Sequence, residues 1–531
     1  MGPTIGIRPN IPHRSLALIL VVVVVGVGWP VVSAARAATP AGQVTEFAAG
    51  IVRGSVPYGI TAGPDGNTWF TEAEGNRIGR ITPSGVVTEF AAGITASSEP
   101  RGITAGPDGN VWFTEYYGDR IGRITPQGVV SEFAAGITPG SRPREITAGP
   151  DGNMWFTEAG GHRIGRITPQ GVVTEFAAGI TAGSVPFGIT AGPDGNMWFT
   201  EAEGHRIGRI TPQGVVREFA AGITAVSRPR GITAGPDGNM WFTEYSGNRI
   251  GRITPSGVVS EFAVGITAAA EPQGITAGPD GNMWFTEYGG NRIGRITPQG
   301  VVSEFAAGIT AGSYLRGITA GPDGNVWFTE YGGDRIGRIT TGATRALTTT
   351  KAGTGTGTVT SLPAGIACGA TCVAEVDYLA PVTLTATAAA GSRFAGWSGE
   401  ACSGTGTCAV AMDAARSVIA TFALDVPAVS VDPPVVRVAR TSLGFSSKVT
   451  VNRAGTIAQR FTSGSRAVRT WCRTSRTFAA AGTYTLTCNL GKAGRRYIRT
   501  MALKGAVRTT FTVTGEPAVQ SNRTVTIRRR R

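Results

Sequence analysis

A block of fourteen residues, GITAGPDGNxWFTE, occurs seven times in this chain, and each copy starts 43 residues after the previous one. No insertion interrupts the series. A fixed period of this length indicates a repeat architecture, in which every repeat forms the same small unit of secondary structure. The copies start at Gly59, Gly102, Glu145, Gly188, Gly231, Gly274 and Gly317, so the third has glutamate in place of the first glycine.

Each repeat predicts four short β-strands. Asp65-Gly66 is a strong hairpin signal, and Thr82-Pro83-Ser84-Gly85 has the composition of a second turn. In the first repeat the strands are expected at 59–62, 68–72, 77–81 and 86–90. Four strands in 43 residues match the size of a β-propeller blade.

The two ends of the repeat region predict a closed ring. Residues 44–47 repeat the fourth strand ahead of the first complete block, whereas the last repeat stops after its third strand at 335–340. The first strand can therefore complete the last blade. A β-solenoid, the alternative, would not need this offset and would need capping repeats. We expect an all-β chain, with a seven-bladed β-propeller at 39–346 followed by two small C-terminal β modules.

Most repeated residues are expected to form the scaffold. A tryptophan buries roughly 150–250 Å² when it packs between neighbouring blades. Seven identical copies in mid-strand favour packing over the alternative, which is carbohydrate stacking. The seven are Trp69, Trp112, Trp155, Trp198, Trp241, Trp284 and Trp327.

A binding site is expected at one end of the ring, where the repeats differ. Strands alternate in direction within a blade, so the loops that enter the first strand and leave the second lie at the same face. Arginine, tyrosine and acidic groups there suit an anionic, peptide-like or sugar-like ligand, small or polymeric. We expect seven residues to line this mouth: Tyr58, Arg101, Arg144, Phe187, Arg230, Gln273 and Arg316.

A glutamate ends the second strand of every repeat. Seven carboxylates around one axis can hold a hard cation such as Mg²⁺ or Ca²⁺. The alternative is that they pair with the arginines of the mouth, for example Glu115 with Arg101. The set is Glu72, Glu115, Glu158, Glu201, Glu244, Glu287 and Glu330.

Residues 1–38 have the features of an export signal. A basic flank with Arg8 and Arg14 precedes an apolar or glycine run at 16–29, and Ala35-Arg36-Ala37 offers an A-x-A cleavage site. An uncleaved anchor is the alternative, although the apolar run is short for a membrane span. In both cases we expect the remaining chain to be secreted or associated with the cell surface.

Six cysteines, all outside the repeats, fit an oxidising compartment. Local pairing is the simplest of the fifteen possible connectivities. Zinc binding is the alternative, but the spacings C-x3-C and C-x5-C are unusual for zinc and no histidine lies nearby. The expected disulfides are Cys368–Cys372, Cys402–Cys408 and Cys472–Cys488.

The block P-x-G-I-T-x-G-P-D-G-x-x-W-F-T-E, followed by R-I-G-R-I, resembles the streptogramin B lyase (virginiamycin B lyase) family over about residues 40–345. The resemblance implies a propeller that opens cyclic depsipeptide antibiotics at the ester by Mg-dependent elimination. It also implies a histidine general base in an E-P-H-G-I segment. The implied metal ligands are the glutamate of that segment and the glutamate that ends the next W-F-x-E strand.

This chain keeps part of that constellation. Arg101 or Gln273 stands where the family has histidine. The arginine pKa lies above 12 and glutamine does not titrate, so neither suits a general base near neutral pH. The other histidines of the repeats, His162 and His205, precede the third strand and are expected to be exposed. The positions that match the metal ligands are Glu99 with Glu115 and Glu271 with Glu287, for Mg²⁺ or Ca²⁺.

The expected function is therefore a surface-associated propeller that binds a ligand, with no catalytic residue assigned. The alternative is an active Mg-dependent carbon–oxygen lyase acting on streptogramin B antibiotics. That enzyme would need another base, such as Tyr58 or Glu99.

Two further modules follow the propeller. Residues 347–424 resemble a divergent InlB-type B-repeat, a small β module of bacterial surface proteins, most specifically in the F-x-G-W-x-G segment at 394–399. Such modules act as spacers or adhesion units, so we expect no chemistry there.

The last module, 425–531, is expected to be a basic β-sandwich. It holds 20 Lys or Arg and three acidic residues, about +17, whereas the whole chain carries +14. An exported basic module can bind an anionic cell-envelope polymer, or nucleic acid without specificity. A solvated surface without a partner is the alternative. The arginines alternate with Thr and Ser rather than with aromatic residues, so no specific nucleic acid is expected. We expect a monomer.

Overall fold

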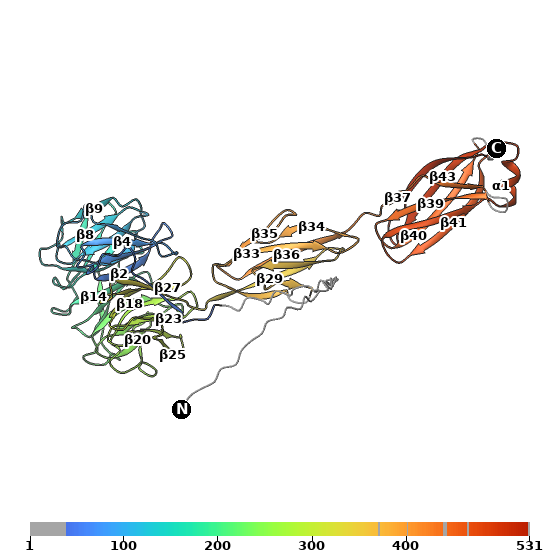
Figure 1. The fold of residues 1–531 in the computed structure, drawn as a ribbon. Helices are drawn as coiled ribbons and strands as arrows, with labels where there is room; N and C mark the ends of the chain where they lie inside the picture. Colours follow the sequence, from blue (N-terminus) through green and yellow to red (C-terminus); the bar gives the residue numbers. More distant parts are fainter. Residues whose placement is uncertain (1–38, 370–371, 401, 439–442, 465–466, 529–531) are drawn as a thin grey trace, which may run out of the picture. The chain divides into compact units, whose positions relative to one another are not determined.

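In the computed structural model, the described residues are 39–369, 372–400, 402–438, 443–464 and 467–528. The predicted export signal at 1–38 lies outside them. Across these residues, no helix combines the length and the apolar character needed to cross a bilayer. The described chain is almost entirely β-structure and forms a propeller and two smaller β modules (Figure 1).

The propeller contains seven four-stranded antiparallel sheets, which confirms the fold predicted from the repeat. The first strands are β2(Pro57–Ala62), β6(Pro100–Ala105), β10(Pro143–Ala148), β14(Pro186–Ala191), β18(Pro229–Ala234), β22(Pro272–Ala277) and β26(Leu315–Ala320). The second strands are β3(Thr68–Glu72), β7(Val111–Glu115), β11(Met154–Glu158), β15(Met197–Glu201), β19(Met240–Glu244), β23(Met283–Glu287) and β27(Val326–Glu330).

The outer half of each blade follows the same order. The third strands are β4(Arg77–Ile81), β8(Arg120–Ile124), β12(Arg163–Ile167), β16(Arg206–Ile210), β20(Arg249–Ile253), β24(Arg292–Ile296) and β28(Arg335–Ile339). The fourth strands are β5(Val87–Phe90), β9(Val130–Phe133), β13(Val173–Phe176), β17(Val216–Phe219), β21(Val259–Phe262), β25(Val302–Phe305) and, for the last blade, β1(Val44–Phe47).

Among the described residues, the strand nearest the N-terminus is β1, and it closes the ring. In the last sheet β1 pairs antiparallel with β28, with Val44 opposite Ile339 and Phe47 opposite Ile336. The first strands also contact one another in sequence around the ring, and β26 contacts β2 as β2 contacts β6. The predicted offset closure is therefore confirmed, and the open solenoid is excluded.

The repeated tryptophans pack between neighbouring blades. Trp69 is fully buried and lies in one apolar cluster with Ile103 and Phe113 of the next blade. Its Nε1 donates to Asp65 Oδ1 at 3.0 Å, and its ring stacks on Phe90 at 5.5 Å. The same stacking and hydrogen bond recur at the equivalent tryptophans, so the turn aspartate of the PDG segment anchors the indole as well as the hairpin.

The glycine of the RIGRI strand is required by the aromatic residue of the strand beside it. A Cβ added to Gly79 would lie 2.1 Å from the ring of Phe70. Phe70 is fully buried and pairs with Gly79 across the sheet. A phenylalanine opposite a glycine thus fills the interior of each blade without widening it.

The second module consists of two four-stranded sheets that enclose one core. One sheet has the order β32(Val373–Asp377), β29(Thr344–Ala352), β36(Arg416–Leu424), β34(Ser392–Ser398). The other has the order β31(Ala367–Cys368), β30(Gly357–Leu362), β33(Pro381–Ala388), β35(Cys408–Ala411). Its core includes Leu384, Val418 and Phe422, and Trp397 donates to the carbonyl of Gly406 at 2.7 Å.

The third module is a two-sheet sandwich. One sheet holds β37(Val429–Val431), β38(Val435–Val438), β39(Leu443–Val451) and β42(Gly482–Asn489). The other has the order β41(Arg469–Phe478), β40(Gly455–Ser463), β43(Leu503–Thr512), β44(Val519–Ile527). One short helix, α1(Gly491–Tyr497), follows β42 and was not anticipated from the sequence.

All six cysteines form disulfides with the expected local connectivity. Cys368–Cys372 and Cys402–Cys408 lie within the second module. Cys472 of β41 pairs with Cys488 of β42 and so ties together the two sheets of the third module.

Candidate ligand-binding site at the propeller mouth

Each first strand contains a β-bulge near its start, and this bulge presents the variable side chain. In β10, Pro143 pairs with Glu158 and Ile146 with Phe156, so Arg144 and Glu145 together oppose one residue of β11. The same shift occurs in the first strands of the other six blades. Bulges redirect side chains and are frequent beside functional sites.

The backbone just before each bulge is strained. The residue two positions ahead of the mouth residue has a left-handed backbone in every repeat, including Val56 at φ 56° and Val185 at φ 53°. This conformation is unfavourable for a β-branched residue. The loop is held in place by the loop after the second strand, for example by the Gly75 N–H, which donates to the Ser55 carbonyl at 3.0 Å.

Four of the seven predicted mouth residues line one cavity of about 140 Å³, and Arg101, Arg144 and Arg230 are not part of its lining. Tyr58, Phe187, Gln273 and Arg316 all contribute to its lining. Polar groups beside an apolar wall are the usual composition of a ligand site. The apolar part of the wall is formed by six isoleucines of the first strands: Ile60, Ile103, Ile189, Ile232, Ile275 and Ile318.

Tyr58 is held between two arginines from other blades. Its hydroxyl accepts hydrogen bonds from Nη2 of Arg144 and Nη2 of Arg316, each at 2.9 Å. Burial by itself would raise the pKa of the Tyr58 phenol, but the charges of Arg144, Arg316 and Arg101 outweigh it, so the pKa is lowered. Tyr58 thus acts as an acceptor within a cluster of cations.

The mouth arginines also stack on aromatic rings. The Arg144 guanidinium lies 3.6 Å from the centre of the Phe187 ring, and that of Arg101 lies 3.3 Å from the Tyr116 ring. Arg230 lies 3.3 Å from the Tyr245 ring. Stacking of this kind stabilises a cation and fixes its orientation. The mouth therefore presents arginines in fixed positions.

Three of these arginines keep unused hydrogen-bond donors. The Nε atoms of Arg144, Arg230 and Arg316 are buried and have no partner among the described residues. Arg230 donates from Nη1 to Gln273 Oε1 at 2.7 Å, which leaves its Nε free. Burial lowers the pKa of Arg230 to about 10. Buried, unpaired guanidinium donors are costly unless an acceptor binds to them.

Glu145 adds one carboxylate to this cluster. It lines the cavity and stands in the third repeat, where the other six repeats have glycine. Burial raises the pKa of Glu145 to about 7, against the opposing charges of Arg144, Arg316 and Arg101. The substitution is visible in the sequence, but its position in the mouth was not predicted. The signal was the presence of a charged residue in an otherwise invariant glycine column.

The sequence profile of the Virginiamycin B lyase family matches residues 33–134 and 94–373, which together are more than half of the chain. The chain belongs to the virginiamycin B lyase family. The profile of the divergent InlB B-repeat domain matches residues 347–426, which confirms the second resemblance. A comparison with curated proteins gives no match.

Solved structures of virginiamycin B lyases resemble the propeller. A streptogramin B lyase structure is 38% identical, with a TM-score of 0.53, and the match covers 57% of this chain and 100% of that one. The virginiamycin B lyase from Staphylococcus aureus is 40% identical, with a TM-score of 0.52 and coverage of 56% and 99%. A catalytically inactive histidine-to-alanine variant of that enzyme, with quinupristin, matches equally well.

In the first E-P-x-G segment, Arg101 stands at the x position and forms an ion pair with Glu99. Arg101 donates from Nη2 to Glu99 Oε1 at 2.6 Å and from Nε to the same oxygen at 3.0 Å. The alternative in which Arg101 pairs with Glu115 is wrong. Glu115 is instead buried within its blade, 3.8 Å from Arg120. Burial, and next the hydrogen bond to Glu132, raise the pKa of Glu115 to about 9.

The second segment is more open. Glu271 Oε2 accepts a hydrogen bond from the Tyr245 hydroxyl at 2.9 Å, and no arginine or lysine of the described residues pairs with it. Burial, and next the charge of Glu304, raise the pKa of its partner Glu287 to about 8.

These carboxyl groups do not by themselves form a complete metal site. In the described parts of the chain, no group of three or more His, Cys, Asp or Glu side chains lies close enough to hold a metal ion. A Mg²⁺ ion can be bound by two carboxylates when water completes its shell. Glu99 is already paired with Arg101, whereas no arginine or lysine of the described residues pairs with Glu271. Metal binding by the four residues stays a prediction.

The two repeat histidines belong to loops rather than to the mouth. His162 and His205 precede the third strand and are half-buried, not exposed as expected. His205 Nδ1 accepts from the Arg228 N–H at 3.3 Å, as Asn76 Oδ1 accepts from Ser98 in the first blade. Both histidines have the left-handed backbone of Asn76, so they replace it structurally.

Proposed function

We propose that this protein works outside the cytoplasm as a ligand-binding propeller, with its ligand held at the mouth. The observation that supports this most directly is the group of buried, unpartnered Nε donors on Arg144, Arg230 and Arg316. A ligand with oxygen acceptors would complete these donors. The stacked aromatic rings hold the guanidinium groups ready, so little conformational freedom is lost on binding.

Export is supported by the chemistry of the trailing modules. Three disulfides require an oxidising environment, and a B-repeat domain is typical of bacterial surface proteins. We infer a secreted or surface-associated protein.

Binding is favoured over catalysis because the family's base is replaced. Arg101 keeps its proton at any physiological pH and is occupied by Glu99 and Tyr116. Gln273 cannot accept a proton and its side-chain oxygen is used by Arg230. Loss of a general base lowers rates by about 10²–10⁴-fold.

The test is to incubate the purified protein with a streptogramin B compound, with Mg²⁺ or with EDTA. Ring opening by elimination leaves the mass unchanged, so the linear product is detected by chromatographic retention and fragment ions. We expect no linear product. In parallel, a panel of polar small molecules is screened by thermal shift, with Arg316→Gln as the variant that should lose the response. Linear product that disappears with EDTA would contradict the proposal.

A lyase with a different base is the second candidate, and Tyr58 is the observation that favours it. Its phenol pKa is lowered by the charges of Arg144 and Arg316 despite burial, and Tyr58 lines the cavity. A tyrosine in this state can accept the proton that elimination removes next to a carbonyl. Tyr58→Phe would abolish any EDTA-sensitive ring opening if this candidate were correct.

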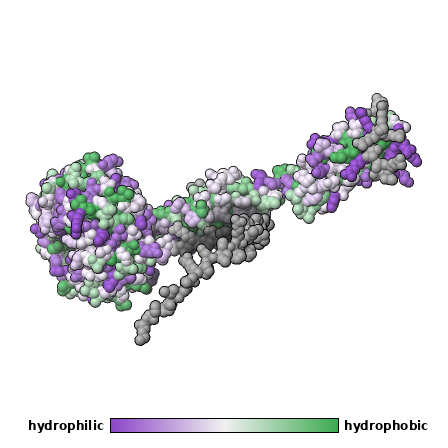
Figure 2. Space-filling model, viewed as in Figure 1, coloured by the Kyte–Doolittle hydropathy of each residue, from purple (hydrophilic) through white to green (hydrophobic). Residues whose placement is uncertain are grey.

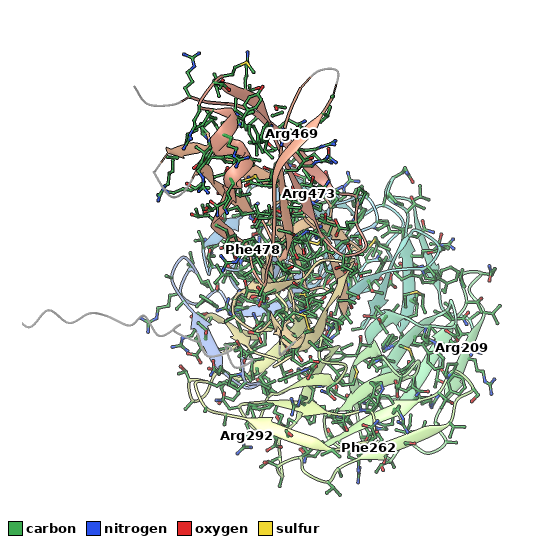
Figure 3. All side chains as sticks on the ribbon, turned by 90° about the vertical axis from the view of Figure 1, so that its right-hand side faces the viewer. Arg209, Phe262, Arg292, Arg469, Arg473 and Phe478 are labelled. Carbon is green, nitrogen blue, oxygen red and sulfur yellow. A yellow bond between two sulfur atoms is a disulfide. The ribbon has the colours of Figure 1, made fainter. Side chains whose placement is uncertain are left out.

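For the third module we propose binding to an anionic cell-envelope polymer. On one sheet face, Arg460 of β40 stands opposite Arg473 of β41 and opposite Arg508 of β43. Like charges directly across neighbouring strands are unfavourable. All three are exposed and line a groove of about 480 Å³. Arg473 is labelled on this module in Figure 3, and hydrophilic residues cover much of its visible face in Figure 2.

The role of this row of three arginines is tested by measuring binding of the full chain to immobilised teichoic acid, a polyphosphodiester. We expect the variant with Arg460, Arg473 and Arg508 changed to Gln to bind more than about tenfold more weakly, and wild-type binding to vanish by roughly 0.5 M salt. The matched control changes Arg437, Lys448 and Arg523, which lie outside the row. Equal losses of affinity in both variants would show that binding depends on net charge alone and not on the row of arginines. Tighter binding to duplex DNA would contradict an envelope partner.

A further inference from the structure

The third repeat carries a carboxyl group, that of Glu145, close to the arginines of the mouth. Glu145 directly follows Arg144 in the bulge of β10. Its Oε2 leans toward the neighbouring blade, where a Cβ added to Gly102 would lie 3.0 Å from it. No hydrogen bond or ion pair holds this carboxyl group within the described residues, although arginines surround it.

The charged and titratable groups that face Glu145 come from four strands. Tyr58 projects from β2, Arg101 from β6, Arg144 from β10 itself and Arg316 from β26. Arg144 and Arg316 both donate to Tyr58, so the three form a bridge across the cavity mouth. Glu99 neutralises Arg101 directly, whereas Arg144 and Arg316 have no carboxylate partner among the described residues.

An anion that enters this cavity meets two opposite influences. Arg316 lines the cavity, and Arg144 and Arg230 donate to the lining residues Tyr58 and Gln273. The free Nε donors of these three arginines attract the anion and offer hydrogen bonds. An ionised Glu145 would repel it in a confined space, whereas a protonated Glu145 could donate a hydrogen bond to it. Burial already favours the neutral form, and burial raises the pKa of Glu145 to about 7. A bound anion would favour the proton further.

We propose that the mouth binds a small oxyanion, which Arg144 and Arg316 hold beside Tyr58, and that Glu145 takes up one proton as the anion binds. This inference rests on the proposed binding function. The ligand class is a carboxylate, sulfate or phosphate group, free or at the end of a larger molecule. The apolar wall of isoleucines would accommodate the remainder of such a molecule.

Sulfate is the appropriate probe, because it does not titrate between pH 5 and 9. Binding of sulfate to the full chain is measured by calorimetry across this range, in buffers with different heats of ionisation. Above the pH at which Glu145 of the unliganded protein loses its proton, we expect the dissociation constant of the wild-type protein to rise by up to about tenfold per pH unit. Binding there should take up about one proton. Glu145→Gln should bind more tightly at high pH and without proton uptake.

Matched variants separate the parts of this inference. Glu145→Gly restores the residue of the other six repeats and should also remove the pH dependence. Arg144→Gln and Arg316→Gln should each lose sulfate binding at every pH. If Glu145→Gln keeps the wild-type pH dependence, proton coupling is wrong while the anion site stands. If the wild-type protein binds no sulfate at any pH, the oxyanion class is wrong, and the ligand screen of the proposed function still decides that function separately.

Discussion

Single side chains at the mouth decide whether this propeller can do acid–base chemistry. The two E-P-x-G segments have different residues where the family has histidine, and these residues are held to different degrees. Arg101 is locked by Glu99 and by stacking on Tyr116, whereas Gln273 makes one hydrogen bond, with Arg230. The second segment also leaves Glu271 without a cationic partner among the described residues. A gain of activity is therefore expected from the second segment rather than the first.

We predict that Gln273→His gives measurable Mg-dependent ring opening of a streptogramin B compound. The imidazole would supply the missing base, and the nearby Arg230 would help keep it neutral. The readout is the linear product described above, with and without EDTA. Gln273→Ala is the control for removal of the glutamine alone. If Gln273→His and Gln273→Ala are equally inactive, the absent histidine does not account for a lack of activity.

The mouth positions were predictable because repeats that are otherwise identical differ there. Tyr58 and Arg316 stand in register in the sequence and meet in space. The direction of Glu115 was not predictable, because the end of a strand does not show whether its last side chain faces the axis or the blade interior. Glu145 was missed because its column was interpreted as glycine and the bulge has no sequence signature of its own.

At the scale of elements, the second and third strands could be predicted to the residue, because turns bound them on both sides. The structure places β3 at Thr68–Glu72 and β4 at Arg77–Ile81, as expected. The first strand starts earlier than expected, at Pro57, since the bulge extends its pairing. The helix α1 is too short to produce a visible 3.6-residue pattern.

The closing strand β1 carries a prediction of its own. Phe47 stacks on Trp327 of the last blade at 5.4 Å, and Glu46 Oε2 accepts from the Thr310 hydroxyl at 2.6 Å. Removing a packed phenylalanine costs about 3–5 kcal/mol, and each kcal/mol shifts the melting temperature of a large domain by about 2–4 °C. A chain that starts at residue 49 should therefore melt about 10 °C lower than one that starts at residue 39. Equal melting temperatures would show that β1 does not close the ring.

At the scale of the whole molecule, the seven strand-end glutamates are buried, and each lies beside a half-buried glutamate of the fourth strand. Glu244 is fully buried, and both of its oxygens lack a donor among the described residues. Burial, and next the charge of Glu261, raise the pKa of Glu244 to about 9. The equivalent groups have pKa values raised to about 7 to 9. In six blades the fourth-strand carboxylate beside this group accepts from a threonine of the loop, as Glu261 does from Thr224, whereas Glu89 of the first blade accepts from the Val52 N–H.

This arrangement predicts a propeller that loses stability as the pH rises. A carboxyl group whose folded pKa lies above its unfolded value binds its proton more tightly in the folded state. Its stabilising contribution is complete below about pH 4.5 and is lost as the pH rises through the folded pKa, here about 7 to 9. Melting temperatures of the wild-type protein should therefore fall between pH 6 and pH 9. Glu244→Gln, which mimics the protonated form, should melt above the wild-type temperature at pH 6 and by a larger margin at pH 9. Glu74→Gln, at an exposed site, is the control and should follow the wild-type curve. A wild-type melting temperature that rises from pH 6 to pH 9 would contradict protonated carboxyl pairs in the blades.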